Sequence, residues 1–180
     1  MSTTSKDGCW GLVQVYTGNG KGKTTAAIGL AMRAAGWGKR VLIIQFLKGR
    51  DTGELHSLAR LSPLVKVIQA GSGEFCQPGE RPPGLAEATE RALGLAETAL
   101  ASGEYELVIL DEILVAVSAG LAPLERVLKL VRHKPKSVEL VLTGRGAPPE
   151  LEAEAHLVTY MTEVKHPFRC GVEARRGVDY

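Results

Sequence analysis

The chain has 180 residues, which is enough for one α/β domain with a core of its own. Hydrophobic residues make up 44% and charged residues 23%, as in an ordinary globular protein. A net charge of only +2, an aromatic content of 5% and the lack of any apolar run near the roughly 20 residues of a membrane span argue against nucleic-acid and membrane partners. We therefore expect a cytoplasmic protein, and its three scattered cysteines are typical of reduced thiols.

The first elements of the chain surround a glycine-rich stretch. Residues 1–8 are polar and predict a flexible tail, followed by a single domain over residues 9–180. An apolar run at 10–16 predicts a strand. An alanine-rich run at 24–35 predicts a helix that is well buried because it carries almost no charge, with Gly36 as its C-terminal cap.

Residues 17–25 lie between this strand and this helix, which is the context of a phosphate-binding loop. Glycines let backbone N–H groups turn toward an anion, and the helix N-terminus adds free N–H groups and a positive dipole end. The usual spacing is G-x-x-x-x-G-K-[ST], and here Thr17 occupies the first glycine position. We predict triphosphate binding, with Lys23 as a cation for the phosphates and the Thr24 hydroxyl directed to a magnesium ion.

Further apolar runs alternate between strand and helix patterns along the rest of the chain. The pattern predicts strands at 41–46, 64–70, 106–112, 138–143 and 156–161, a short additional strand around Val172, and helices at 85–99, at 124–131 and, short, from Pro148. Such alternation favours an α/β fold of the P-loop NTPase-like, RecA-like kind, with a mostly parallel sheet and helices on both faces.

Two irregular segments are candidates for function. The polar stretch 48–54 follows the carboxyl end of the second predicted strand, where ligands of open α/β sheets bind. Residues 71–84 form the longest irregular segment, and loops of this length are usually functional or disordered. Phe75 is the single large apolar side chain in that segment, and it either anchors the loop to the core or faces a ligand.

Asp111 and Glu112 end the strand predicted at 106–112 and form the second element of phosphate chemistry. In P-loop folds an aspartate at this place helps to hold magnesium, and in hydrolytic ATPases a neighbouring glutamate orients the attacking water. Thr24, Asp111 and Glu112 are therefore the candidate metal-site residues. Arg33 and Arg145 are candidate guanidinium partners of a polyphosphate, although Arg33 could equally pair with the last carbonyls of its own helix. The residues alone indicate a magnesium-nucleotide enzyme or switch.

Several motifs in a fixed order resemble one family. They are the string at 17–27, Asp111-Glu112, and the stretches 143–146, 164–167 and 177–180. Together they cover residues 11–180 and resemble the P-loop family of ATP:corrinoid adenosyltransferases, which act on cob(I)alamin or cob(I)yrinic acid a,c-diamide. The resemblance implies transfer of the 5′-deoxyadenosyl group of ATP to the Co(I) centre of a reduced corrinoid, with release of triphosphate, in adenosylcobalamin biosynthesis or salvage. It also implies Mg²⁺, a reductase or flavoprotein electron donor, and a homodimer.

The resemblance also implies roles for individual residues. Co(I) is a strong nucleophile that attacks C5′ of the ribose, so the protein needs no general base and must stabilise the departing triphosphate. Lys23, Thr24 and Glu112 are then the expected catalytic residues, with the γ-phosphate deepest in the loop. Family members often carry G-x-G-F-T-W in the long loop, which here begins Gly71-Ser72-Gly73-Glu74, so Phe75 is the expected corrinoid contact. The expected ATP-binding set is Gly18, Asn19, Gly20, Lys21, Gly22, Lys23, Thr24, Thr25, Arg33 and Arg145.

Two other functions remain open at this point. The main alternative is a P-loop ATPase or nucleotide switch, with Glu112 as the water-orienting base and a protein or nucleic-acid partner. The other is a nucleotide-binding module of a larger assembly. The products separate them, because an adenosyltransferase releases intact triphosphate in the presence of a corrinoid, whereas an ATPase releases phosphate without one.

Overall fold

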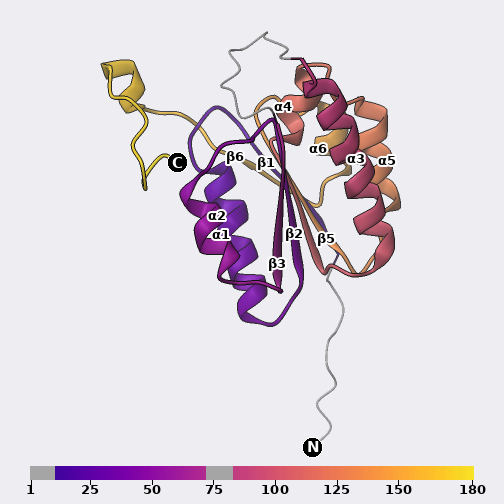
Figure 1. Ribbon diagram of the computed structural model, residues 1–180. Helices are drawn as coiled ribbons and strands as arrows, with labels where there is room; N and C mark the ends of the chain where they lie inside the picture. The colour runs from indigo at the N-terminus through magenta and orange to yellow at the C-terminus, as the bar shows by residue number, and fades with distance from the viewer. Residues whose placement is uncertain (1–10, 72–82) are drawn as a thin grey trace, which may run out of the picture.

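Six strands pair in parallel to form one sheet, in the order β3-β2-β4-β5-β1-β6. The computed structural model describes residues 11–71 and 83–180 (Figure 1), so the predicted tail at 1–8 and the predicted corrinoid contact Phe75 lie outside the described residues. The strands are β1 Val13–Thr17, β2 Val41–Phe46, β3 Val65–Ala70, β4 Leu107–Asp111, β5 Glu139–Thr143 and β6 Leu157–Tyr160. The predicted parallel α/β sheet is confirmed.

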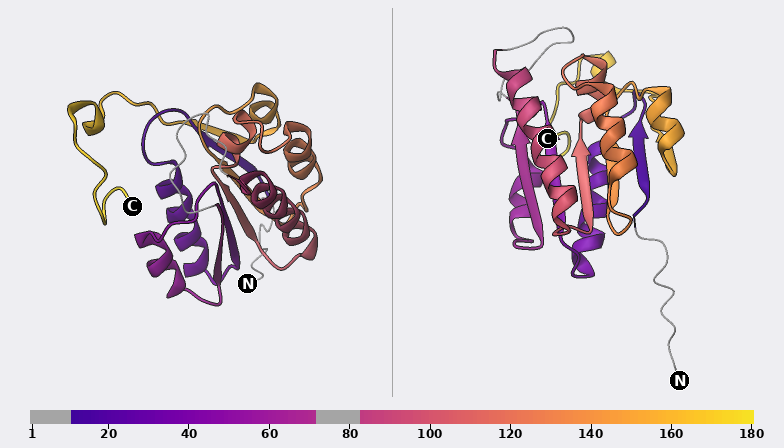
Figure 2. Two further views of the ribbon diagram at one scale, coloured as in Figure 1. Left: turned by 45° about the horizontal axis from the view of Figure 1, so that its top comes forward. Right: turned by 90° about the vertical axis from the view of Figure 1, so that its right-hand side faces the viewer.

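Helices cover both faces of the sheet (Figures 1 and 2). One face carries α1 Lys23–Gly36 and α2 Gly53–Ala59. The other face carries α3 Leu85–Ser102, α4 Ile113–Ser118, α5 Leu124–His133 and α6 Pro149–Glu154, and a short 3-10 helix, η1 Pro167–Cys170, lies in the C-terminal tail. Among the described residues no helix is long and apolar enough to cross a membrane.

Burial on both faces of the sheet explains why the sequences of the three central strands are continuous apolar runs. Every residue of β2, β4 and β5 is buried, because helices cover these strands on both faces. Side chains alternate along a strand, so Ile43 packs with the cluster of α1 whereas Leu42 and Ile44 pack with the cluster of α3 and α5. The rigid centre of the sheet thus fixes where the loops at its carboxyl edge begin.

The prediction that the alanine-rich helix α1 is well buried is wrong for one of its sides. Only one stripe of α1 faces the sheet, and its buried apolar members are Ala27, Ala31, Ala34 and Ala35. On the other side Met32 is 55% exposed. This helix carries little charge because its small side chains pack closely against the sheet on one side. Lack of charge in the sequence therefore does not show that the whole helix is buried. The predicted cap is also shifted, because Gly36 is still helical and Gly38 adopts the left-handed conformation with φ of 72°.

Three other details differ from the sequence prediction. The short helices α2 and α4, of 7 and 6 residues, were not predicted, because segments of this length show too little periodicity. The strand predicted around Val172 is absent from the described tail, where η1 ends at Cys170 and no further element follows.

The strand order decides which loops meet at the carboxyl edge of the sheet. Strand β5 lies between β1, which leads into the phosphate loop, and β4, which ends in the two carboxylates. All strands point the same way, so the segments that follow β1, β2, β4, β5 and β6 leave the same edge of the sheet.

Candidate active site

A cavity of about 660 Å³ lies at this edge, between the phosphate loop and the C-terminal tail. The tail leaves β6, stands away from the sheet and returns toward α1 and α2 (Figures 1 and 2). Basic side chains dominate the polar part of the cavity wall, which suits a polyanion. The wall includes Asn19, Gly20, Lys21, Gly22, Lys23, Thr24, Lys48, Glu112, Arg145, Lys165, His166, Pro167, Phe168, Arg175 and Asp179.

The shape of the phosphate loop depends on two glycines that touch the segment after β6. Gly18 has φ of 93°, and a Cβ atom there would lie 2.5 Å from the carbonyl oxygen of Met161. The N–H of Gly20 donates to the same oxygen at 2.7 Å, and a Cβ on Gly20 would lie 2.8 Å from it. Side chains at these positions would therefore push the loop away from Met161.

Thr17, at the first position of the loop motif, is compatible with this geometry. It is the last residue of β1, in extended backbone opposite Tyr160 of β6, and the sharp turn begins only at Gly18. The Thr17 side chain is buried, and its hydroxyl accepts a hydrogen bond of 3.3 Å from the N–H of Ala147. A threonine here anchors the loop to the segment after β5 without opposing the turn.

Lys23 begins α1 and is folded against the loop. Its ammonium donates to the carbonyl oxygens of Gly18 at 2.7 Å and Gly20 at 2.8 Å. Burial lowers the pKa of Lys23, and the nearby Arg145 lowers it further, whereas Glu112 and Asp111 act in the opposite direction. The ammonium thus lies inside the loop, where it is available to phosphate oxygens in place of backbone carbonyls.

Asp111 joins three elements through one buried carboxylate, which is 1% exposed. Its Oδ1 accepts hydrogen bonds from the hydroxyls of Thr24 at 2.9 Å and Thr143 at 2.7 Å. Its Oδ2 accepts from the ammonium of Lys48 at 2.8 Å and from the amide of Gln45 at 3.3 Å. Because the donors come from α1, from β5 and from β2 and the loop after it, this carboxylate fixes the relative positions of the loops around the cavity.

The Thr24 hydroxyl and the Asp111 carboxylate fit a magnesium ion that arrives with a polyphosphate. Both are hard oxygen donors, and Mg²⁺ usually takes one or two protein oxygens together with substrate phosphates and water. In residues 11–71 and 83–180 there is no group of three or more His, Cys, Asp or Glu side chains that could hold a metal ion.

Glu112 caps α4 and carries a strained backbone, with φ of 63°. Its N–H donates to the hydroxyl of Thr143 at 3.0 Å, and the residue lines the cavity. Burial raises the pKa of the Glu112 carboxyl above its ordinary 4.5, and the charge of Asp111 raises it further, whereas Lys48, Lys23 and Arg145 act in the opposite direction. The carboxylate therefore faces cations but is poorly solvated.

This pKa shift predicts a pH dependence of stability. Glu112 holds its proton more tightly in the folded chain than in the unfolded chain, so the free energy of unfolding falls as pH rises from 4.5 through the raised pKa. Glu112→Gln removes this ionisation, and we expect the variant to exceed the wild type in stability at neutral pH and to approach it toward pH 4.5. Urea denaturation across this range measures the difference, with Glu125→Gln on the exposed side of α5 as the control. A constant difference at all pH values would contradict the prediction.

The C-terminal tail is fastened to the phosphate loop through Lys21. The Lys21 ammonium forms an ion pair with the Asp179 carboxylate and donates to the carbonyl oxygen of Val178 at 3.0 Å. Asp179 also accepts from the N–H of Arg175 at 2.9 Å and from its guanidinium at 3.0 Å. These contacts, chiefly that with Lys21, hold the pKa of Asp179 well below its usual range. A carboxylate of this chain thus contacts a lysine that we predicted to bind phosphate.

Asp179→Asn is expected to strengthen the binding of inorganic tripolyphosphate by about two- to fivefold, a modest gain because an exposed ion pair of this kind is weak. The reason is that the phosphates no longer compete with a carboxylate for Lys21. Isothermal titration at low ionic strength measures the affinity, and Glu87→Gln, which also removes one negative charge but at an exposed position of α3, is the matched control. Weaker binding in Asp179→Asn would show that Asp179 supports the site.

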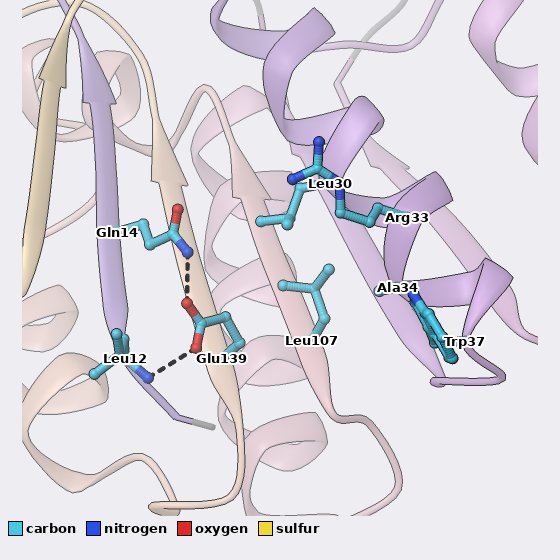
Figure 3. Close-up of a pocket in the computed structure, with 8 residues that line it drawn as sticks. All are labelled: Leu12, Gln14, Leu30, Arg33, Ala34, Trp37, Leu107 and Glu139. Atoms are coloured by element: carbon cyan, nitrogen blue, oxygen red, sulfur yellow. Dashed lines mark hydrogen bonds between the residues drawn. The ribbon is translucent and has the colours of Figure 1, made fainter. Parts of the chain in front are cut away.

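The structure brings most, but not all, of the predicted ATP-binding residues together. Arg145 lies in the cavity wall, whereas the exposed Thr25 is not among the lining residues. Arg33 lies in the last turn of α1, ten residues after Lys23 and thus about 15 Å further along the helix axis. It borders a different cavity of about 300 Å³, where Figure 3 shows it near Leu30. The prediction that Arg33 contacts the nucleotide receives no support from this placement.

Several residues in or beside the cavity were not among the predicted site residues, including Lys48 and Asp179 in its wall and the buried Thr143, which donates to Asp111. Lys48, Thr143 and Asp179 lie in segments that the sequence singled out for other reasons, namely the polar loop after β2, the string at 143–146 and the closing string at 177–180. The signal that could have found Lys48 is its place directly beyond the carboxyl end of a buried parallel strand. Thr143 and Asp179 required knowledge of contacts across the sheet and across the tail.

Comparison with known proteins agrees with this site. The family model described as ATP:corrinoid adenosyltransferase BtuR/CobO/CobP matches residues 10–180. The chain belongs to this family. A corrinoid adenosyltransferase of Pseudomonas aeruginosa is 38% identical over 171 residues, which cover 94% of this chain and 84% of the relative. A corrinoid adenosyltransferase of Escherichia coli K12 is 36% identical, with 94% and 86% covered, and the corrinoid adenosyltransferase CobA of Salmonella typhimurium is similar to the same extent.

A solved structure extends the comparison of the fold. A KaiC-like protein of Pyrococcus horikoshii OT3 superposes with a TM-score of 0.51 at 15% identity, covering 85% of this chain and 73% of its own. At this level of identity the likeness concerns the fold alone. Membership in the ATP:corrinoid adenosyltransferase family confirms the resemblance of the ordered motifs, and the hydrolytic alternative is not favoured.

Proposed function

We propose that this protein transfers the 5′-deoxyadenosyl group of ATP to the Co(I) centre of a reduced corrinoid and releases triphosphate. The observation that carries the proposal is the family match over residues 10–180, which includes every segment that forms the described cavity. ATP and a corrinoid are then the two substrates. The residues around the cavity explain how such a reaction is assisted.

The chemistry requires the protein to bind and stabilise a leaving group. The Co(I) electron pair forms the new cobalt–carbon bond, while the bond between C5′ and the α-phosphate oxygen breaks and its electron pair leaves with the triphosphate. The negative charge therefore grows on the oxygen that departs. Lys21, Lys23 and the backbone N–H groups of the phosphate loop lie where they can bind that triphosphate, and each such contact is most valuable when the charge develops.

Magnesium is part of the proposal. Thr24 and Asp111 would hold the ion, and the bound ion would supply further neutralisation of the triphosphate. The positions of Glu112 and Arg145 in the cavity wall support contacts with the ribose, the metal-bound water or the nucleotide. Attack at carbon needs no proton transfer, so Glu112 acts here by its charge and its hydrogen-bonding capacity.

The cellular setting follows from the substrates. Co(I) must be produced by reduction, so we propose a reductase or flavoprotein as electron donor and a cytoplasmic reaction. We also propose a homodimer, which would cover apolar surface that one chain leaves open, such as Trp37 on α1, 84% exposed, and Leu157 on the edge strand β6, 42% exposed.

The decisive experiment combines purified protein, ATP, Mg²⁺ and chemically reduced cobalamin in the dark. We expect a light-sensitive cobalt–carbon product and an equal amount of intact triphosphate. Release of orthophosphate that does not depend on the corrinoid would overturn the proposal in favour of an ATPase. Repeating the assay with cobinamide and an a,c-diamide precursor identifies the preferred acceptor.

A further inference from the structure

Lys48 lies at the point where the proposed metal ligands meet. Its ammonium is 2.8 Å from Oδ2 of Asp111 and 3.3 Å from the hydroxyl oxygen of Thr24. These two residues supply the oxygens that we assign to magnesium. A cation of the chain itself therefore occupies the place beside Asp111 that suits a divalent ion.

The backbone around Lys48 is held in an unusual shape. The preceding residue, Leu47, has φ of 60°, a left-handed conformation that is unfavourable for a residue with a side chain. Its N–H donates to the carbonyl oxygen of Ala70 at 3.0 Å. Gly71 packs against this turn so closely that a Cβ atom would lie 2.6 Å from the nitrogen of Lys48. The backbone of Lys48 is thus fixed at the point where the paired strands β2 and β3 end. Such strained backbone is often found at functional sites.

Charge and access suggest what this function is. The side chain of Asp111 is 1% exposed, so a negative charge there is unfavourable without a cation in contact. The side chain of Lys48 is 27% exposed and lines the same cavity as Lys21 and Lys23, so it has space to turn toward a ligand there. Two cations at one carboxylate repel each other, and the flexible lysine is the one that can move.

We propose that Lys48 is a further triphosphate-binding residue that neutralises Asp111 in the empty enzyme and turns to the triphosphate when Mg²⁺ takes its place. This inference rests on the proposed function for the identity of its ligand. It assigns two states to one side chain: paired with Asp111 before the nucleotide binds, and in contact with phosphate oxygens afterwards. Such an exchange keeps the buried carboxylate neutralised throughout.

The test uses Lys48→Gln, which removes the charge but keeps a hydrogen-bond donor for Asp111. Two affinities are measured by isothermal titration without any corrinoid: that for Mg²⁺ alone, and that for inorganic tripolyphosphate at saturating Mg²⁺. We expect Mg²⁺ alone to bind about tenfold more tightly than to the wild type, because it no longer competes with an ammonium. We expect tripolyphosphate to bind about tenfold more weakly, because a charge-assisted hydrogen bond is lost. Lys66→Gln, at an exposed position of β3, is the matched control and should equal the wild type.

The two opposite changes distinguish the proposal from simpler roles. A structural lysine would weaken both affinities, and a bystander would change neither, so either result overturns the proposal. An increase for Mg²⁺ without a decrease for tripolyphosphate overturns the phosphate contact. Failure of adenosyl transfer would overturn the proposed function while leaving these two binding measurements intact.

The wild-type protein provides a second measurement that does not depend on the folding of a variant. Acetylation of Lys48 by a limiting amine reagent is followed by mass spectrometry. Mg²⁺ alone should accelerate the modification about tenfold or more by releasing the ammonium from Asp111, and Mg²⁺ with tripolyphosphate should suppress it again. An unchanged rate in both conditions would overturn the exchange.

Discussion

Lys23→Ala is expected to reduce adenosyl transfer by about 10²–10³-fold, the usual effect of removing one group that stabilises developing charge. The Lys23 ammonium lies inside the phosphate loop, within 2.7 Å of the Gly18 carbonyl oxygen and 2.8 Å of the Gly20 carbonyl oxygen. No other lysine reaches these two oxygens in the described part of the chain. Initial rates of cobalt–carbon bond formation, together with tripolyphosphate affinity, measure the loss.

The matched control is Lys129→Ala, the same change at an exposed position of α5. It should transfer at the wild-type rate. Circular dichroism and thermal unfolding should show that Lys23→Ala remains folded, because alanine favours a helix and the four buried alanines of α1 are untouched. A folded Lys23→Ala enzyme with full activity would contradict the assignment of the phosphate loop.

Asp111→Ala is expected to lower both stability and magnesium-dependent binding. The substitution leaves the Thr143 hydroxyl and the Gln45 amide without their acceptor and removes the partner of Lys48. We expect a loss of about 2–4 kcal/mol in the free energy of unfolding, which is below the cost of breaking a fully buried pair because Lys48 can reach water. For a chain of this size the melting temperature should fall by roughly 5–10 °C.

Binding provides the second signature of Asp111→Ala. Tripolyphosphate should bind equally with and without Mg²⁺ in this variant, whereas Mg²⁺ should strengthen binding to the wild type. Asp51→Ala, which removes a side chain that is 71% exposed, is the control and should stay within about 0.5 kcal/mol of the wild type. A variant that keeps its stability but still responds to Mg²⁺ would show that the metal is held elsewhere.

Local patterns in the sequence were sufficient for much of this fold. The strands predicted at 41–46 and 106–112 match β2 and β4 to within one residue at each end, because strands covered on both faces contain little besides apolar residues. The phosphate loop could be recognised in the sequence because the strand, the glycines, the lysine and the helix follow one another directly. Helix α1 shows the limit of such patterns, since lack of charge did not reveal that one of its sides is exposed.

The assembly of the cavity depended on contacts between residues far apart in the chain. Sequence alone placed Thr24 and Asp111 near phosphate chemistry, because each follows a strand end in a known motif. Only the tertiary structure joined Lys48 to Asp111 across 63 residues and Lys21 to Asp179 across 158, and only it placed Arg33 at another cavity. The physical reason is that the strand order and the path of the tail determine these contacts. Neither of them produces a local pattern in the sequence from which the contacts could be predicted. The sequence thus determined which phosphate-binding and metal-binding groups the chain carries, and the tertiary structure decided which of them lie together in one cavity.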